Sequence, residues 1–155
     1  MTAATLRAGV IGVGYLGAFH AEKYASMDGV QLVAVADADA DRATEIATRH
    51  QATAFTDYRQ MFDQVDCVSI AAPTLLHAEI AATCLTHGID VLVEKPLTHA
   101  IEDGRHLVTL AAQQQRILQV GHLERFNPAI RALADIITQP RFIECHRLAP
   151  FVERG

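Results

Sequence analysis

The 155-residue sequence has no tryptophan and only three cysteines, and aromatic side chains make up 6% of it. Cys67, Cys84 and Cys145 are far apart, form no C-x-x-C pair and are odd in number. This pattern excludes a disulfide framework and a thiolate zinc site. We therefore expect free thiols, no metal centre and a reducing, cytoplasmic compartment.

Positive charge is also scarce in this sequence. The 13 lysines and arginines stand against 18 acidic residues, so the formal net charge is -5. A surface of this sign repels phosphate backbones and anionic membranes, so neither nucleic-acid binding nor membrane binding is expected. No apolar run reaches the length of a membrane span, and the N-terminus lacks the features of a signal peptide. These absences predict a soluble cytoplasmic protein.

What the sequence does contain is an alternation of short apolar runs with longer amphipathic stretches. A chain of this length buries a core without disulfides. The apolar runs lack strict polar alternation, as in strands covered by helices on both faces. We predict an α/β fold with a doubly wound parallel sheet in three layers, αβα. The predicted strands are 6–11, 31–36, 53–55, 66–71, 90–93 and 117–120, and the predicted helices are 15–27, 39–50, 74–86 and 98–115, with a brief helix around Met61.

The pattern changes after Gly121. Pro128 favours the first turn of a helix, which is expected to end near Gln139. The alternation of side chains over residues 141–148 then predicts one more strand, for which the preceding sequence offers no obvious partner.

Gly12, Gly14 and Gly17 form a G-x-G-x-x-G motif between a predicted strand and a predicted helix. In this context the first glycine allows a tight turn, and the second lets the backbone approach a pyrophosphate. The third permits close contact between helix and strand. The N–H groups at the start of the helix, at Tyr15 and Leu16, then face the phosphates. Taken alone, the motif also fits a glycine-rich turn of another α/β protein.

Asp37 strengthens the prediction of a dinucleotide site. It ends the second strand, 20 residues after Gly17, where a carboxylate accepts hydrogen bonds from the ribose hydroxyls of adenosine. The same charge would repel a 2′-phosphate, so NAD is preferred over NADP. Two alternatives stay open: Asp37 caps a helix beside Asp39 and Asp41, or Arg42 restores some NADP binding.

Three further motifs follow in order: A-P-T-L-L-H at 72–77, E-K-P-L at 94–97 and G-H-L-E-R-F-N-P at 121–128. With the glycine motif, they resemble the N-terminal half of the Gfo/Idh/MocA oxidoreductases over roughly the whole chain. The resemblance implies a dinucleotide-binding Rossmann domain over residues 1–122. It also implies that residues 123–155 are a connecting helix and the first strand of a truncated C-terminal substrate domain. Such a fragment is expected to bind cofactor without turnover.

The resemblance assigns roles to the loops after the fourth and fifth strands. Lys95 would be the catalytic residue, in contact with the hydroxyl that is oxidised, either as a cation or as a base. Glu94 would anchor the cofactor ribose or cap local backbone. The other implied cofactor contacts are Ala72, Pro73, Thr74, His77 and Lys95 itself. From residue type alone, Lys95 is a solvated surface residue and His77 a satisfied polar residue in the first turn of a helix.

Arg125 and Asn127 follow the sixth strand, and the resemblance places them where the two domains meet. They would bind substrate together with Lys95, because arginine suits diphosphate recognition. The alternative for Arg125 is a surface ion pair with Glu124. Five further histidines lack the spacing of metal ligands and are interpreted as ordinary surface or helix-end residues: His20, His50, His87, His99 and His106.

Within the family, the stretches 121–129 and 141–151 look most like members that act at C3 of UDP-linked N-acetyl sugars. The chain is therefore expected to be the NAD-binding part of an enzyme that moves a hydride from that carbon to NAD. The alternatives are a dehydrogenase of a free sugar or polyol and a non-catalytic NAD-binding sensor. Family members often associate through the C-terminal sheet, so a homo-oligomer is expected for the full-length protein.

Overall fold

The computed structural model describes residues 5–134, 136–144, 146 and 148. The chain divides into two compact units, Met1–Gly121 and His122–Gly155, which are described separately. The first unit contains a six-stranded sheet in the order β3-β2-β1-β4-β5-β6, with every neighbouring pair parallel. The strands are β1 (Leu6–Ile11), β2 (Val30–Ala36), β3 (Thr53–Phe55), β4 (Cys67–Ile70), β5 (Asp90–Val93) and β6 (Leu118–Val120).

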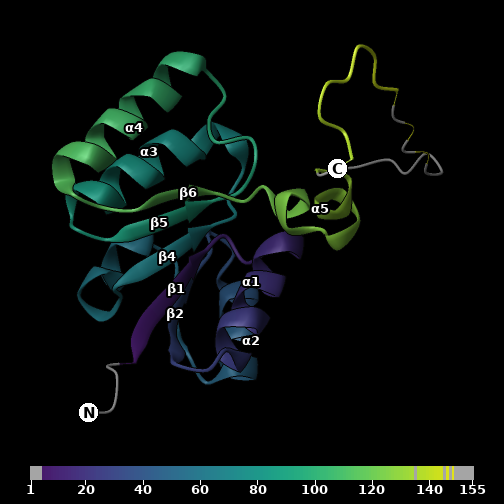
Figure 1. The fold of residues 1–155 in the computed structure, drawn as a ribbon. Helices are drawn as coiled ribbons and strands as arrows, with labels where there is room; N and C mark the ends of the chain where they lie inside the picture. The colour runs from purple at the N-terminus through teal and green to yellow at the C-terminus, as the bar shows by residue number, and fades with distance from the viewer. Residues whose placement is uncertain (1–4, 135, 145, 147, 149–155) are drawn as a thin grey trace. The chain divides into compact units, whose positions relative to one another are not determined.

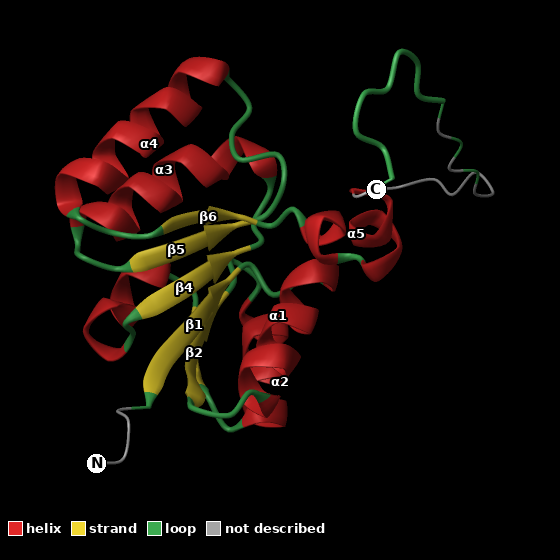
Figure 2. Cartoon of the chain, in the orientation of Figure 1, coloured by secondary structure: helices red, strands yellow, loops and turns green. Residues whose placement is uncertain are grey.

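Helices cover both faces of this sheet, as Figure 1 and Figure 2 show. One face carries α1 (Tyr15–Ser26) and α2 (Ala40–His50), and the other carries α3 (Thr74–Thr86) and α4 (Ile101–Gln114). A 3₁₀ segment, η1 (Tyr58–Gln64), connects β3 to β4. The predicted three-layer αβα fold is confirmed, and its strand order is that of a Rossmann domain. None of the described helices has the length and apolar character needed to cross a bilayer.

The core has two parts because alternate residues of each strand face opposite helical layers. In β1, Val10 packs with Ala21 of α1 and Ile46 of α2. The next residue, Ile11, belongs to the larger cluster formed with α3, α4 and η1. That cluster includes the fully buried Met61. Burial of a side chain of this size contributes about 1.5–3 kcal/mol.

The helix boundaries follow local chemistry. Asp39 is the N-cap of α2, where its carboxylate accepts hydrogen bonds from two backbone N–H groups of the first turn. Helix α4 begins at Ile101 rather than near residue 98. The Thr98 hydroxyl donates to the carbonyl oxygen of Ala100 at 2.7 Å, which keeps this segment in a turn before the helix. Other ends differ from the predictions by a residue or two, as is usual for frayed ends.

The second unit departs from the sequence prediction. It contains a short 3₁₀ segment, η2 (Leu123–Phe126), and a seven-residue helix, α5 (Pro128–Ala134). The helix does not extend to Gln139, and the described residues of 141–148 are not in a strand. Alternating side chains are not enough to make a strand, because its backbone groups need a partner with which to form hydrogen bonds.

Candidate functional site

The turn between β1 and α1 needs glycine at two positions. Gly12 has a φ of 81°, and a Cβ on it would lie 2.6 Å from the backbone nitrogen of Ala72. A Cβ on Gly17 would overlap the carbonyl oxygen of Gly12. The first and third glycines of the motif therefore bring β1, α1 and the loop after β4 into direct contact.

Gly14 has a different role, because nothing lies within 4 Å of the position that its Cβ would take. Gly14 is the N-cap of α1, which therefore has no side-chain cap, and the first turn contains no acidic residue. The uncapped N–H groups of this turn, which includes Tyr15 and Leu16, border the open space at the positive end of the helix dipole. A diphosphate fits this cradle, which a side chain at residue 14 would enter.

Asp37 follows β2 and is held beside the glycine turn. Its Oδ2 accepts a hydrogen bond from the Val13 N–H at 2.9 Å, and its Oδ1 accepts one from the Asp39 N–H at 3.0 Å. Arg42 Nη1 lies 3.3 Å from Asp37 Oδ1, and Arg42 Nη2 lies 3.1 Å from Asp39 Oδ2. The acid predicted to meet a ribose is thus fixed in place and has a permanent cation as its neighbour.

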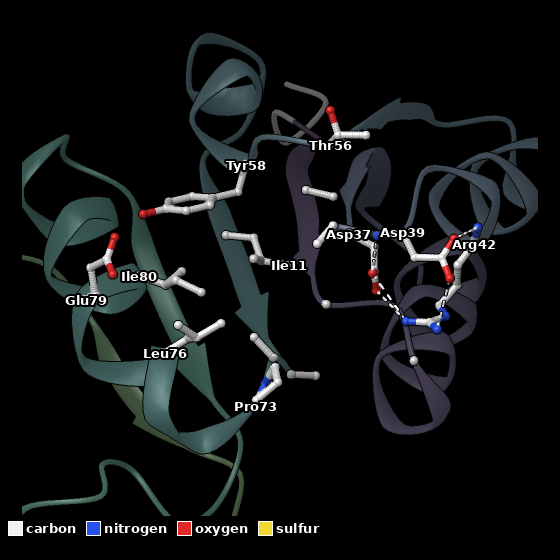
Figure 3. A pocket seen from close by; sticks show the side chains of 16 residues that line it. Ile11, Asp37, Asp39, Arg42, Thr56, Tyr58, Pro73, Leu76, Glu79 and Ile80 are labelled. Carbon is white, nitrogen blue, oxygen red and sulfur yellow. Dashed lines mark hydrogen bonds and ion pairs between the residues drawn. The ribbon is translucent and has the colours of Figure 1, made fainter. Parts of the chain in front are cut away.

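A pocket of about 650 Å³ lies between the ends of β1, β2 and β4 (Figure 3). The ion pair of Asp37 and Arg42 forms one side of the pocket, and Leu76 and Ile80 of α3 form the apolar side opposite it. Tyr58 of η1 completes this apolar wall, and burial raises the pKa of its hydroxyl. The volume and the mixture of a polar and an apolar wall suit a nucleoside.

His77 of α3 connects the loop after β4 to the loop after β5. Its ring is 1% exposed, with Nε2 2.8 Å from the carbonyl oxygen of Ala72 and Nδ1 2.9 Å from that of Pro96. A neutral imidazole donates to one of these oxygens, and an imidazolium donates to both. Pro73 lines the pocket and is the N-cap of α3, which begins at Thr74. The structure thus places His77 as a link between two loops, with both ring nitrogens engaged by backbone.

Glu94 and Lys95 are the first two residues after β5 and have different surroundings. Glu94 is 4% exposed, and its Oε2 accepts the N–H of Lys95 at 3.2 Å. Lys95 is exposed, and its ammonium group makes no ion pair with any residue that the structure describes. A free cation at the carboxyl edge of a parallel sheet is accessible to a ligand there.

His20 is not the ordinary surface or helix-end residue that was predicted. The side chain is 16% exposed, and it lies between Ser69 Oγ and Glu94 Oε1, each 3.1 Å from a ring nitrogen. Two signals were present in the sequence. Residue 20 shares a helix face with Gly17 and Tyr24, and Ser69 interrupts an otherwise apolar strand.

Arg125 and Asn127 lie in the second unit. Arg125 is exposed, and Asn127 accepts the N–H of Ala129 through its side-chain oxygen at 3.0 Å, which caps the start of α5. The Asn127 amide also donates to Glu124 Oε2 at 2.7 Å. The described residues contain no cluster of histidine, cysteine and acidic side chains that could hold a metal ion.

Comparison with known proteins assigns the chain to a family. Residues 6–122 match the family model for the Gfo/Idh/MocA oxidoreductases, described as an oxidoreductase family with an NAD-binding Rossmann fold. The chain belongs to the Gfo/Idh/MocA family. The glycine turn, Asp37 and the pocket beside them are therefore parts of an NAD-binding domain.

The relatives include enzymes with different substrates. UDP-N-acetylglucosamine 3-dehydrogenase of Acidithiobacillus ferrooxidans is 41% identical over 97% of this chain and 48% of its own length. In its solved structure, 86% of this chain superposes on 44% of that chain with a TM-score of 0.81. Inositol 2-dehydrogenase of Rubrobacter xylanophilus is 36% identical over 83% of this chain and 38% of its own length.

A third relative was solved with cofactor. GenD2 from gentamicin A biosynthesis, solved in complex with NAD, is 33% identical and has a TM-score of 0.75 over 78% of this chain and 35% of that chain. The Gfo/Idh/MocA chain described here spans about half the length of the curated relatives it matches, or less.

Proposed function

We propose that this chain is the cofactor-binding half of a dehydrogenase that oxidises the C3 hydroxyl of a UDP-N-acetylhexosamine to a ketone. The main support for this substrate is the similarity to UDP-N-acetylglucosamine 3-dehydrogenase, which is 41% identical in sequence over 97% of the chain. The open cradle at Gly14 and the pocket beside Asp37 support the cofactor.

The cofactor contacts are proposed along the carboxyl edge of the sheet. The diphosphate would lie on the turn and first helical residues at Gly12, Gly14, Tyr15, Leu16 and Gly17. The Asp37 carboxylate would accept hydrogen bonds from the hydroxyls of the adenosine ribose. The nicotinamide half would meet the loops after β4 and β5, through Ala72, Pro73, Thr74, His77, Glu94 and Lys95.

Lys95 is proposed as the residue that contacts the reacting hydroxyl. Its ammonium group would hold the hydroxyl oxygen, or the neutral amine would take the hydroxyl proton, while the hydride leaves the same carbon. When bound, NAD supplies the hydride acceptor. Arg125 and Asn127 are proposed to bind the nucleotide-sugar, with the guanidinium of Arg125 suited to a diphosphate.

A longer protein that contains this chain and its substrate domain tests the role of Lys95. We expect Lys95→Met to reduce NAD reduction with UDP-N-acetylglucosamine by at least about a hundredfold, the range for loss of a positioned acid or base. Lys23→Met is the matched control, because Lys23 is the one other lysine of the sequence and is exposed on α1. Retained turnover in Lys95→Met would remove this residue from the mechanism.

The preference for NAD over NADP is also a proposal, and it rests on Asp37. Asp37→Ala should weaken NAD binding about tenfold through loss of a charged hydrogen-bond acceptor. It also frees Arg42 to meet a 2′-phosphate, so the ratio of NAD to NADP affinity should fall. Titration calorimetry with both cofactors measures the ratio, and Asp41→Ala, in the first turn of α2, is the control. An unchanged ratio in Asp37→Ala would exclude the proposed role.

A second candidate substrate is a free sugar or polyol, which the inositol 2-dehydrogenase relative favours. A panel of nucleotide-sugars, free sugars and inositols distinguishes the two candidates by turnover of the longer protein.

A sensor without catalysis is disfavoured, because a sensor has no need for a lysine that is exposed at the ligand edge and makes no ion pair with any described residue. We also propose that the full-length protein is a homo-oligomer. Since Cys67 and Cys84 are free thiols, we propose a cytoplasmic location.

A further inference from the structure

A line of partly and fully buried polar groups connects α1 to the loop that carries Lys95. The Tyr24 hydroxyl lies 2.7 Å from Ser69 Oγ, which lies 3.1 Å from His20 Nδ1. On its other side, His20 Nε2 lies 3.1 Å from Glu94 Oε1, and Glu94 Oε2 accepts the backbone N–H of Lys95 at 3.2 Å. Three elements contribute side chains to this line: α1, β4 and the end of β5.

The hydrogen bonds of this line have one consistent direction when Glu94 is ionised. A carboxylate only accepts, so His20 donates from Nε2, and the Nδ1 of the neutral ring then accepts the Ser69 hydroxyl hydrogen. The Ser69 oxygen in turn accepts from Tyr24. His20 is therefore the group that supplies the buried Glu94 carboxylate with its side-chain donor.

The space around the Glu94 carboxylate is closely fitted. A Cβ on Gly121 would lie 2.9 Å from Glu94 Oε1, so the glycine after β6 leaves room for this oxygen. The Glu94 backbone N–H donates to the carbonyl oxygen of Ile70 at 2.9 Å, which fixes its main chain to β4. Successive residues of an extended chain project to opposite sides, and an inward Glu94 accordingly precedes an exposed Lys95.

We propose that His20 is a positioning residue: it holds the Glu94 carboxylate, and through it the Lys95 backbone, at the nicotinamide half of the cofactor site. This inference rests on the proposed function. The diphosphate cradle follows β1 and the ribose-binding Asp37 follows β2, so the rest of a dinucleotide extends toward β4 and β5. Substitution of His20 should therefore weaken the binding of NAD but not the binding of ADP, because ADP ends at the diphosphate.

The experiment measures NAD and ADP dissociation constants for the 155-residue chain and three variants by calorimetry. His20→Leu removes the donor to Glu94, whereas His20→Gln keeps an N–H₂ group near the place of Nε2. His106→Leu, on the exposed face of α4, is the matched control. We expect His20→Leu to weaken NAD binding about tenfold, with ADP binding within twofold of the wild type. His20→Gln should recover most of the NAD affinity.

The outcomes separate this inference from the proposed function. A wild-type chain that binds neither NAD nor ADP contradicts the proposed function itself. If the wild type binds NAD but His20→Leu loses NAD and ADP equally, His20 has a merely structural role and the inference is wrong. A glutamine variant as weak as the leucine variant would also overturn it, because the donor to Glu94 would then not be what matters.

Discussion

Asp37 and Glu94 occupy equivalent positions in the fold, each as the first residue after a parallel strand and on either side of the central pair β1 and β4. Their carboxylates are similarly buried, with side chains 10% and 6% exposed. Asp37 is held by backbone N–H groups of two nearby turns and by Arg42. Glu94 depends on His20, which is 74 residues away in the sequence.

This difference shows two ways to hold a buried acid at a ligand edge. The partners of Asp37 include an arginine, which is charged at every physiological pH. Those of Glu94 are one backbone N–H and a histidine that belongs to a longer polar line. The position of the Asp37 carboxylate, here called the Asp37 side of the ligand edge, therefore depends on local turns. The position of the Glu94 carboxylate, the Glu94 side, depends on the packing of α1 against β4. Substitutions that affect one side, both sides or neither test this distinction.

The largest effect is expected where both sides meet, at the glycine turn. Gly17→Ala places a methyl group on the carbonyl oxygen of Gly12, where backbone must move. We expect a loss of more than about 3 kcal/mol in the free energy of unfolding. Gly14→Ala meets no atom within 4 Å, so its stability should fall by less than about 1 kcal/mol while NAD binding weakens. Urea unfolding and NAD titration measure both; equal stability of the two variants would contradict this account.

The next largest effect is expected on the Glu94 side. Ser69 is fully buried, and Ser69→Ala leaves the Tyr24 hydroxyl and His20 Nδ1 without the oxygen that they share. The free energy of unfolding should fall by about 1–3 kcal/mol, the cost of unsatisfied buried polar groups. Ser26→Ala, at the exposed end of α1, is the control and should change stability by less than about 0.5 kcal/mol. Equal effects would show that the polar line does not stabilise the fold.

A smaller effect is expected on the Asp37 side. Asp39→Ala removes the side-chain cap of α2 and one partner of Arg42. We expect a loss of about 1 kcal/mol in the free energy of unfolding, as for other N-cap replacements. Asp41→Ala, two residues later in the first turn of α2, keeps the cap and should have little effect on the free energy of unfolding in the same urea titration. A larger loss in Asp41→Ala than in Asp39→Ala would exclude the capping role.

The same distinction explains what the sequence could predict. The alternation of strands and helices that gives the parallel three-layer fold and the glycine turn depend on patterns that are readable along the chain, and these predictions are confirmed. His20 was misread because its partners, Ser69 and Glu94, come from distant segments that only the folded sheet brings together. The described residues of the predicted strand at 141–148 are not in a strand for a related reason: side-chain alternation is a local pattern, whereas a strand needs a partner.

The smallest effect is expected at the opposite end of the strands, where Arg7 and Asp66 form an exposed ion pair. Hydrogen bonds from Arg7 lower the pKa of Asp66 from its usual value. A lowered pKa contributes stability above the unfolded-state value, about 3.9, and this contribution is lost as the pH falls through the folded-state value. Asp66→Asn should therefore be slightly less stable than the wild type at pH 7 and equal to it in acid, as urea midpoints at the two pH values would show.

NAD affinity provides the second measurement for this variant. Arg7 lies at the amino end of β1 and Asp66 precedes β4, whereas the cofactor cradle follows the carboxyl end of β1. Asp66→Asn should therefore leave the NAD dissociation constant unchanged at pH 7. If NAD binding weakens as much as in Asp37→Ala, the carboxyl edge is not energetically separate from the rest of the sheet, and the contrast between Asp37 and Glu94 cannot be assigned to their local partners.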